Sequence, residues 1–164
     1  MRFVGHRRPL GALLLACCLP LAACEEAPRP TTATAIDGDS LMWGDVEVRL
    51  HGIDAPELRQ ACGGRDGGRW PCGRAARNWL RKLLRRGSVT CRRVTTDRYG
   101  RMVGICTVNG RDVGRAMVRA GLAVAYVRYS RRYVADERAA RAARRGIWQG
   151  QFTLPHLWRR RHRY

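Results

Sequence analysis

The sequence predicts an α+β domain in which a small β-barrel carries helices. Short stretches of alternating apolar and polar residues come first, an amphipathic stretch follows, and two β-branched stretches precede two further helical ones. Elements in this order favour a barrel with helices packed against it. A chain of 164 residues has room for one such domain and an export segment.

The strands are indicated by period-two alternation and by the turn residues between them. Asp37-Gly38 is typical of a hairpin turn. Apolar and polar residues alternate over 46–51, so this stretch is expected to be a strand whose Arg49 faces away from the core. The β-branched stretches 89–94 and 102–108 predict two more strands joined by a glycine-containing turn.

Helices are indicated by apolar residues at helical spacing, with glycines where the pattern stops. Ser130 is expected to cap the N-terminus of the last helix, and Gly146 to occupy the C′ position that ends it. The predicted helices cover residues 73–86, 112–120 and 131–145.

The N-terminus has the pattern of an export signal. Residues 1–24 combine a basic start with an apolar run that is short for a membrane span, and residues 25–31 resemble a flexible linker. Leu21-Ala22-Ala23-Cys24 resembles the lipobox of bacterial lipoproteins, in which Cys24 would be lipidated; ordinary cleavage after a small residue is the alternative. The folded domain should then cover 32–150, followed by a loosely held basic tail at 151–164.

The charge of the chain favours a polyanionic partner. Lys and Arg number 32 against 13 Asp and Glu, which gives a formal net charge of +19. This charge is far beyond what solubility requires. Lys82 is the single lysine, so the excess of arginine also fits a bias in genomic base composition. Charge alone is therefore compatible with nucleic acid, anionic lipid or polyphosphate.

Four of the 7 cysteines lie beyond the N-terminal segment, and an even number in an exported protein predicts two disulfides. Counting outward from a two-residue turn at 97–100 places Cys91 opposite Cys106, within disulfide reach. Cys62 and Cys72 are then left to close a glycine-rich loop. A zinc site is the competing interpretation, but neither the spacing nor the flanking histidines match a zinc pattern.

Acidic residues are scarce, yet four of the 13 fall in two short motifs, Asp37-Gly38-Asp39-Ser40 and Asp54-Ala55-Pro56-Glu57. Carboxylate and carbonyl oxygens hold hard cations such as calcium, so two carboxylates brought together from these turns would make a cation site. Each motif alone is more typical of an ordinary turn.

Two arginines stand next to these motifs. Arg49 ends the strand leading to Asp54, and Arg101 ends the turn that begins at Asp97. Arginine presents planar, permanently charged donors that match phosphate oxygens, so both are candidates for phosphoryl chemistry. In a chain so rich in arginine, any single one is more often a solvated surface group.

Taken in order, Asp-Gly-Asp-Ser at 37–40, Val-Arg-Leu-His-Gly-Ile-Asp-Ala-Pro-Glu at 48–57 and Asp-Arg-Tyr-Gly-Arg at 97–101 resemble the staphylococcal nuclease family, over roughly residues 32–148. Each motif is weak alone, but their order and spacing make the resemblance specific. Ser40 and Ala55 stand where the founding member has threonines, and a cysteine-bounded loop at 60–72 extends the segment after Glu57. None of these departures removes a catalytic group.

The resemblance implies a five-stranded OB-fold β-barrel with three α-helices, and a calcium-dependent nuclease that hydrolyses the phosphodiester bonds of DNA and RNA. It implies that Asp39 and Asp54 bind Ca²⁺ through their carboxylates and Ala55 through its backbone carbonyl. Glu57 would activate or orient the attacking water. The remaining implied site residues are Arg49 and Arg101 at the scissile phosphate, with Tyr99 and Tyr126 at the nucleotide.

Two other functions fit parts of the pattern. A non-catalytic OB-fold lipoprotein would bind nucleic acid with a basic groove and aromatic platforms, and a structural envelope lipoprotein would hold anionic lipid or cell-wall polymer. Neither function needs the carboxylates and arginines together, because acidic groups beside a phosphate repel it unless a cation neutralises them. We therefore expect an exported, monomeric nuclease that is periplasmic or anchored to the envelope by lipid, or else secreted.

Overall fold

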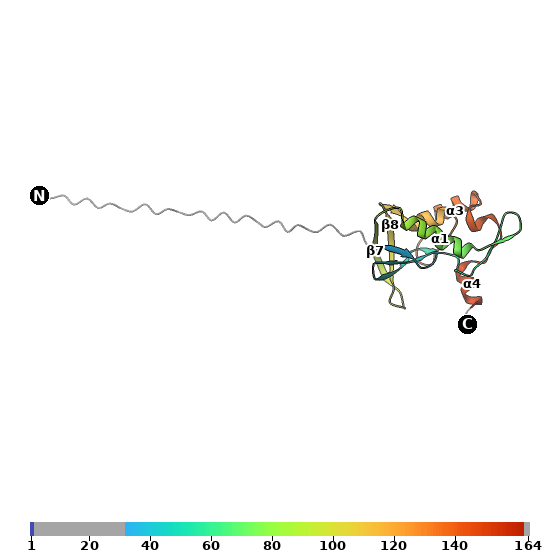
Figure 1. Ribbon diagram of the computed structural model, residues 1–164, viewed down its shortest axis with the longest axis horizontal. Helices are drawn as coiled ribbons and strands as arrows, with labels where there is room; N and C mark the ends of the chain where they lie inside the picture. Colours follow the sequence, from blue (N-terminus) through green and yellow to red (C-terminus); the bar gives the residue numbers. More distant parts are fainter. Residues whose placement is uncertain (2–31, 163–164) are drawn as a thin grey trace.

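A curled, mixed β-sheet forms the framework of the protein (Figure 1). The computed structural model describes Met1 and residues 32–162. The sheet contains β1 (Ala33–Ala35), β2 (Ser40–Trp43), β3 (Val46–Leu50), β7 (Val89–Thr96), β8 (Met102–Val108) and β9 (Arg111–Asp112). Five strands run in the order β1-β2-β3-β8-β7, and β9 pairs with β8. The predicted α+β fold is confirmed, with the five-strand sheet curled into a half-barrel.

The pairing of the strands brings distant parts of the chain together. Only β3 and β8 are parallel, and the other neighbouring pairs of this sheet are antiparallel. Two short antiparallel pairs lie outside it, namely β4 (Ile53–Asp54) with β10 (Val124–Ala125) and β5 (Cys62–Gly63) with β6 (Arg69–Trp70). The β4–β10 pair therefore places the segment after residue 124 beside the Asp54 motif.

The described residues contain α1 (Cys72–Leu84), α2 (Val113–Arg119), α3 (Val134–Ala142), α4 (Pro155–Arg161) and the 3₁₀ helix η1 (Gly146–Gln149). The first two helices lie where they were predicted, but α3 is shorter than 131–145. Ser130 does not cap it, because the Ser130 hydroxyl accepts a hydrogen bond from the Arg132 N–H within a preceding turn. The first left-handed residue after α3 is Arg144, at φ 47°. Gly146 is also left-handed, but it lies two residues further along the chain.

The fourth helix replaces the loosely held tail that the sequence predicted. The segment that leads into α4 is fixed by the buried side chain of Gln60, which donates to the carbonyl of Thr153 over 2.6 Å. The Gly63 N–H likewise donates to the carbonyl of Gln151 over 2.7 Å. Figure 1 shows α4 beside the C-terminus, away from the β7–β8 hairpin. Residues 151–161 are thus part of the folded domain.

Two apolar clusters stabilise this arrangement. The larger one lies between the sheet and the helices α1 and α2, with Leu41, Leu80 and Met117 fully buried. A smaller cluster surrounds the Cys62–Cys72 disulfide, and consists of Cys62, Cys72, Val124 and Ile147 with Trp70, Trp148, Phe152 and Leu154 against them. This smaller cluster joins the cysteine-bounded loop to the C-terminal segment.

The β7–β8 hairpin confirms the predicted Cys91–Cys106 disulfide, although the turn differs from the expected one. The Asp97 N–H donates to the Arg101 carbonyl, so residues 98–100 form a three-residue turn instead of a two-residue turn. A bulge between Arg93 and Thr95 then shifts the register by one residue and restores the opposition of the two cysteines. Cys62 and Cys72 form the second disulfide, as predicted.

The predicted signal segment, the lipobox with Cys24 and the linker fall within residues 2–31, which lie outside the described residues. Among the helices of residues 32–162, none is long and apolar enough to cross a membrane.

Gly73 tests how tightly α1 packs against the segment that carries Glu57. A Cβ at position 73 would lie 1.7 Å from the Glu57 carbonyl oxygen, so the backbone must move to accept any side chain. Gly73→Ala should lower the free energy of unfolding by about 2 to 3 kcal/mol in urea titrations. Arg74→Ala, at the next and exposed position of α1, is the control. Equal stability of the two variants would contradict this packing.

Candidate active site

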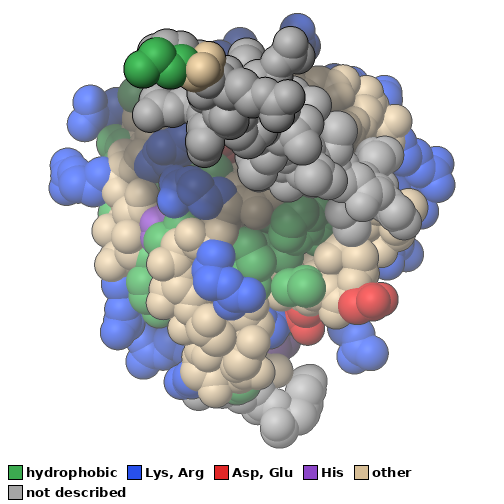
Figure 2. All heavy atoms as spheres, turned by 90° about the vertical axis from the view of Figure 1, so that its left-hand side faces the viewer, with side chains coloured by type: hydrophobic (Ala, Val, Ile, Leu, Met, Phe, Trp, Pro, Cys, Tyr) green, Lys and Arg blue, Asp and Glu red, His purple; other side chains and the backbone are tan. Residues whose placement is uncertain are grey.

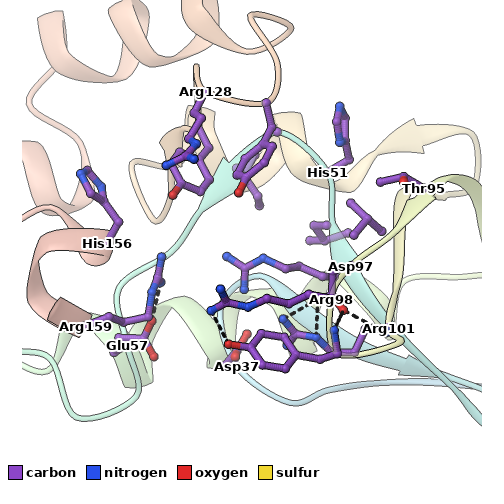
Figure 3. A pocket seen from close by; sticks show the side chains of 18 of the residues that line it. Asp37, His51, Glu57, Thr95, Asp97, Arg98, Arg101, Arg128, His156 and Arg159 are labelled. Carbon is purple, nitrogen blue, oxygen red and sulfur yellow. Dashed lines mark hydrogen bonds and ion pairs between the residues drawn. The ribbon is translucent and has the colours of Figure 1, made fainter. Parts of the chain in front are cut away.

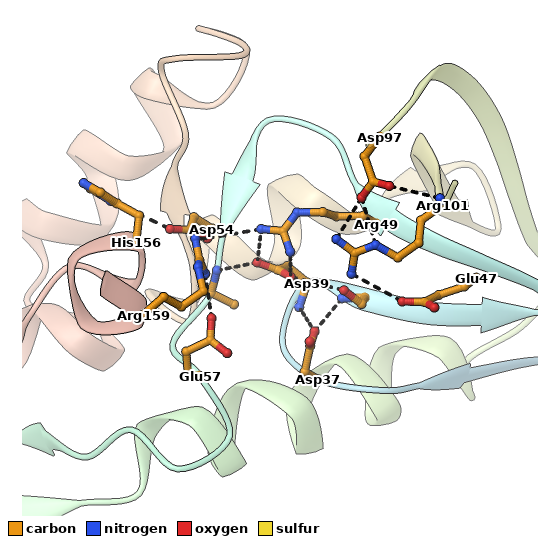
Figure 4. A network of polar contacts seen from close by, with 12 residues as sticks. Asp37, Asp39, Glu47, Arg49, Asp54, Glu57, Asp97, Arg101, His156 and Arg159 are labelled. Atoms are coloured by element: carbon orange, nitrogen blue, oxygen red, sulfur yellow. Dashed lines mark hydrogen bonds and ion pairs between the residues drawn. The ribbon is translucent and has the colours of Figure 1, made fainter. Parts of the chain in front are cut away.

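Two buried carboxylates share the guanidinium of Arg49 (Figure 4). Arg49 donates from Nη1 to Asp39 Oδ1 over 3.1 Å, and from Nη2 to Asp39 Oδ2 over 3.3 Å and Asp54 Oδ1 over 3.2 Å. Asp39 is 3% exposed and Asp54 is 0% exposed. Buried charges require a partner of opposite charge, so Arg49 is one of the groups that allow both acids to be ionised here.

The position of Asp39 is set by the β1–β2 turn. The Asp37 carboxylate accepts the backbone N–H groups of Asp39 and Ser40 over 2.9 Å and 2.7 Å, which is the pattern of an Asx turn. The antiparallel register of β2 and β3 then places Ser40 opposite Arg49. The turn therefore places Asp39 next to the guanidinium of Arg49 on β3.

The position of Asp54 is set by β4 and its partner strand. Asp54 lies opposite Val124 in the β4–β10 pair, and the following N–H, that of Ala55, donates to Asp39 Oδ2 over 2.8 Å. This hydrogen bond ties the two acidic motifs to each other through the backbone. The site is therefore held by both motifs together.

Negative charge is concentrated in this place. The pKa of Asp54 is raised to about 6, mainly by burial and also by the charge of Asp39, while Arg159 and Arg49 oppose the shift. Burial also raises the pKa of Asp37 to about 6, again with a contribution from the charge of Asp39. Additional positive charge would therefore stabilise these carboxylates in their ionised form.

Glu57 lies at the edge of the same site, where Arg159 of α4 binds it. Arg159 donates from Nη1 to Glu57 Oε1 over 2.6 Å and from Nη2 to Asp54 Oδ1 over 2.8 Å. Gln60 fixes the turn after Glu57 with two hydrogen bonds. Its side-chain oxygen accepts the Glu57 backbone N–H, and its backbone N–H donates to the Glu57 carbonyl. Nδ1 of His156, also from α4, lies 3.9 Å from Asp54 Oδ2.

Arg101 belongs to a second cluster, formed by the β7–β8 turn. It donates to Asp97 Oδ2 over 2.8 Å and to Glu47 Oε1 over 3.3 Å. The other oxygen of Asp97 accepts the N–H groups of Tyr99 and Arg101, which fixes the turn. The ring of Tyr99 is 68% exposed, and the Arg101 guanidinium lies 5.6 Å from its centroid.

A groove of about 1200 Å³ connects the two clusters (Figure 3). Five of the predicted site residues line it, namely Arg49, Glu57, Tyr99, Arg101 and Tyr126. The other three, Asp39, Asp54 and Ala55, are buried and reach the groove through their contacts with Arg49, Arg159 and each other. The Tyr126 ring stacks on His156 at a centroid distance of 5.9 Å. The sequence-predicted residues thus come together, and their roles stay predictions.

Arg159 and His156 were not predicted from the sequence, although both line the groove. Arg159 sits in a run of three arginines near the C-terminus, and no local pattern distinguishes it from its neighbours. It lies 105 residues from its partner Asp54 in sequence. Asp97, by contrast, could have been found, because aspartate at the first position of a tight turn has a known hydrogen-bonding role.

The donor atoms of this site fit a hard divalent cation. Within the described residues, the buried Oδ2 of Asp54 has no hydrogen-bond partner, so its lone pairs are free. Over residues 32–162, no three His, Cys, Asp or Glu side chains converge into a cage of their own. Calcium accepts carboxylate, carbonyl and water oxygens in flexible geometry, so Asp39 and Asp54 would be completed by a backbone carbonyl and by water.

Paired carboxylates and arginines lie together at one groove of a curled, OB-like sheet. This combination is typical of proteins that carry out phosphoryl transfer, because arginine matches phosphate and carboxylates can hold the divalent cation that such reactions use. Residues 47–150 match the family described as Staphylococcal nuclease homologue. The chain belongs to the staphylococcal nuclease family, and is an enzyme of the nuclease type found in that family.

Several curated proteins are similar to this chain. An uncharacterized endonuclease of Escherichia coli O157:H7 is 36% identical over 134 residues, covering 77% of this chain and 81% of the relative. The succinoglycan biosynthesis protein ExoI of Rhizobium meliloti is 33% identical over 147 residues, covering 88% and 77%. A probable staphylococcal-like nuclease of Oryza sativa subsp. japonica is 34% identical over 125 residues, covering 74% of this chain but 30% of the relative.

Replacement of Asp37 tests whether the excess of negative charge around Asp39 destabilises the folded protein. Asp37→Asn keeps an oxygen that can accept both backbone hydrogen bonds but removes the charge. Because the folded pKa of about 6 is above the ordinary value of 3.8, the folded state binds more protons between these values, and this group lowers stability as pH rises. In chelator, the variant should be more stable than wild type by about 1 kcal/mol near neutral pH, and most of this gain should vanish by about pH 4.

The matched control is Asp66→Asn, an exposed aspartate whose carboxylate also accepts a backbone N–H in a turn. Urea unfolding of both variants against wild type measures the effect. A gain of equal size in the two variants, or one that does not depend on pH, would contradict the charge excess around Asp39.

Proposed function

We propose that the protein is an exported, calcium-dependent nuclease that hydrolyses the phosphodiester bonds of DNA and RNA. One observation carries this proposal: Asp39 and Asp54 share the guanidinium of Arg49 beside a groove that Arg49, Glu57 and Arg101 line. A protein that only binds nucleic acid does not need buried carboxylates beside a phosphate site, because they repel the substrate. Relatives named endonuclease and staphylococcal-like nuclease support the same activity.

In this proposal, each group of the site has one task. Asp39, Asp54 and the Ala55 carbonyl would hold calcium, which when bound would supply the positive charge that neutralises the acids and polarises a phosphate oxygen. Glu57, at the edge of the groove, would orient the attacking water or accept its proton.

The two arginines, one on β3 and one just before the neighbouring strand β8, would hold the scissile phosphate in the groove. In the described state, Arg49 is paired with Asp39 and Asp54, and Arg101 with Asp97 and Glu47. Neutralisation of the acids would free donors of Arg49 for phosphate, where guanidinium groups stabilise the additional charge of the transition state.

Aromatic rings and overall charge would hold the rest of the nucleic acid. Tyr99 and Tyr126 line the groove and offer ring faces on which bases can stack, which is a sequence-tolerant contact. Lys and Arg side chains are spread over several parts of the face shown in Figure 2, whereas Asp and Glu are few there. The net charge of +19 would attract a polyanion from every direction.

The proposed location is outside the cytoplasm. Two disulfides are typical of proteins that fold in an oxidising compartment, and they agree with the predicted export signal. Lipidation of Cys24 would anchor the protein to the envelope; otherwise it would be free in the periplasm or secreted. The proposed form is a monomer.

The direct test is digestion of single-stranded DNA and of RNA, with calcium or with chelator. Glu57→Gln and Arg101→Ala should each lower the rate by about 100-fold or more, because each removes a group that acts in the transition state. Arg138→Ala removes an exposed arginine of α3 away from the groove and should keep the wild-type rate. Unchanged rates in both site variants would refute the roles given to these residues.

The same assay separates the nuclease from a non-catalytic nucleic-acid-binding lipoprotein. Tight binding of single strands, without cleavage in calcium, magnesium or manganese, would establish the binding protein instead.

A further inference from the structure

Arg159 holds the two carboxylates to which the proposed function gives the most active roles. Its guanidinium contacts Asp54 Oδ1 at 2.8 Å and Glu57 Oε1 at 2.6 Å (Figure 4), and Figure 3 also shows the contact with Glu57. Arg159 lies beyond residues 47–150, the part of the chain that matches the family. The shared pattern of the family therefore does not account for this contact.

Packing places Arg159 in the site. Gln60, in the turn after Glu57, holds the carbonyl of Thr153, and Phe152 and Leu154 pack against the cluster around the Cys62–Cys72 disulfide. Pro155 is buried at the start of α4, one helical turn before Arg159. The cysteine-bounded loop thus orients α4, and α4 in turn places the side chain of Arg159 beside Asp54.

Arg159 and a divalent cation would compete for the negative charge of the same carboxylates, even where the cation binds Oδ2 of Asp54, which has no hydrogen-bond partner within the described residues. Asp54 Oδ1 already accepts from both Arg49 and Arg159, and Asp54 is fully buried. A cation beside Asp54 would lie within a few ångströms of both guanidinium groups, where repulsion between like charges is strong. This repulsion favours the withdrawal of one of these groups from Asp54 when the cation binds.

Arg159 is the group that can withdraw more easily. Arg49 extends from a central strand of the sheet and also contacts both oxygens of Asp39. Arg159 extends from a seven-residue helix near the end of the chain, and its side chain is 32% exposed to solvent against 21% for Arg49. Its guanidinium can therefore turn into the groove without disturbing the sheet.

We propose that Arg159 is a positioning residue that occupies Asp54 and Glu57 as a resident counter-cation, and that a divalent cation binds only by displacing it. This inference rests on the calcium site of the proposed function. The displacement that admits the cation also releases Glu57, the carboxylate expected to act on water. Arg159 thereby sets both the cation affinity of the site and the state in which Glu57 becomes free.

Calcium affinity of the full chain, measured by titration calorimetry with Ca²⁺ alone, tests the competition. Arg159→Gln should bind Ca²⁺ about tenfold more tightly than wild type, an effect within the usual range for coupled binding events. Arg159→Lys keeps the charge but loses the forked geometry, and should fall between the two. Arg161→Gln removes the same charge two residues away, outside the groove, and should bind like wild type.

A thermal unfolding series gives a second readout that does not depend on catalysis. In chelator, Arg159→Gln should melt below Arg161→Gln, because Asp54 and Glu57 lose their partner; calcium should raise its melting temperature more than that of wild type. If Arg159→Gln does not fold in chelator, the comparison of Arg159→Lys with wild type still measures the competition.

The outcomes separate the two proposals. Measurable Ca²⁺ affinities that are equal in wild type, Arg159→Gln and Arg159→Lys would overturn the role of Arg159 and leave the calcium site in place. If Arg159→Gln gains no more Ca²⁺ affinity than Arg161→Gln, the role of Arg159 would also be overturned, since the lower net charge would then explain the gain. Absence of Ca²⁺ binding in every folded variant would overturn the calcium site together with this inference.

Discussion

The burial of Asp54 is the constraint on which the rest of the site depends. A carboxylate without exposed surface requires nearby positive charge, and here Arg49 of β3 and Arg159 of α4 provide it from opposite ends of the chain. The β1–β2 turn, the β4–β10 pair and the C-terminal helix all meet at this group. The ion pairs around Asp54 therefore link the barrel, the groove and the C-terminus.

The cysteine-bounded loop and the C-terminal segment pack together. The loop bounded by Cys62 and Cys72 is closed by a disulfide, and the segment after residue 150 packs on that loop through Phe152 and Leu154. The C-terminal segment then lines the groove through His156 and Arg159 of α4, while the loop supports it from behind. The cysteine-bounded loop and the C-terminal segment thus determine part of the surroundings of the site.

Local patterns predicted most of the site, and contacts between distant segments explain what they missed. Asp39, Arg49 and Asp54 were singled out because they lie in short motifs whose order and spacing are specific, although each motif alone is typical of an ordinary turn or strand. Arg159 was missed because only tertiary packing selects it among three consecutive arginines. At Ser130, a turn competed successfully for the hydroxyl that was expected to cap α3. The Cys91–Cys106 pairing was predicted from the wrong turn length, and a bulge compensated for the error.

We propose above that Asp39 and Asp54 form the cation site of this nuclease. A crystal structure of the protein with calcium, with the ion located by its anomalous scattering, tests it most directly. We expect one calcium ion about 2.3 to 2.6 Å from a carboxylate oxygen of each aspartate, with the Ala55 carbonyl and water completing its shell. Calcium bound elsewhere, with both aspartates still paired to Arg49 and Arg159, would contradict it.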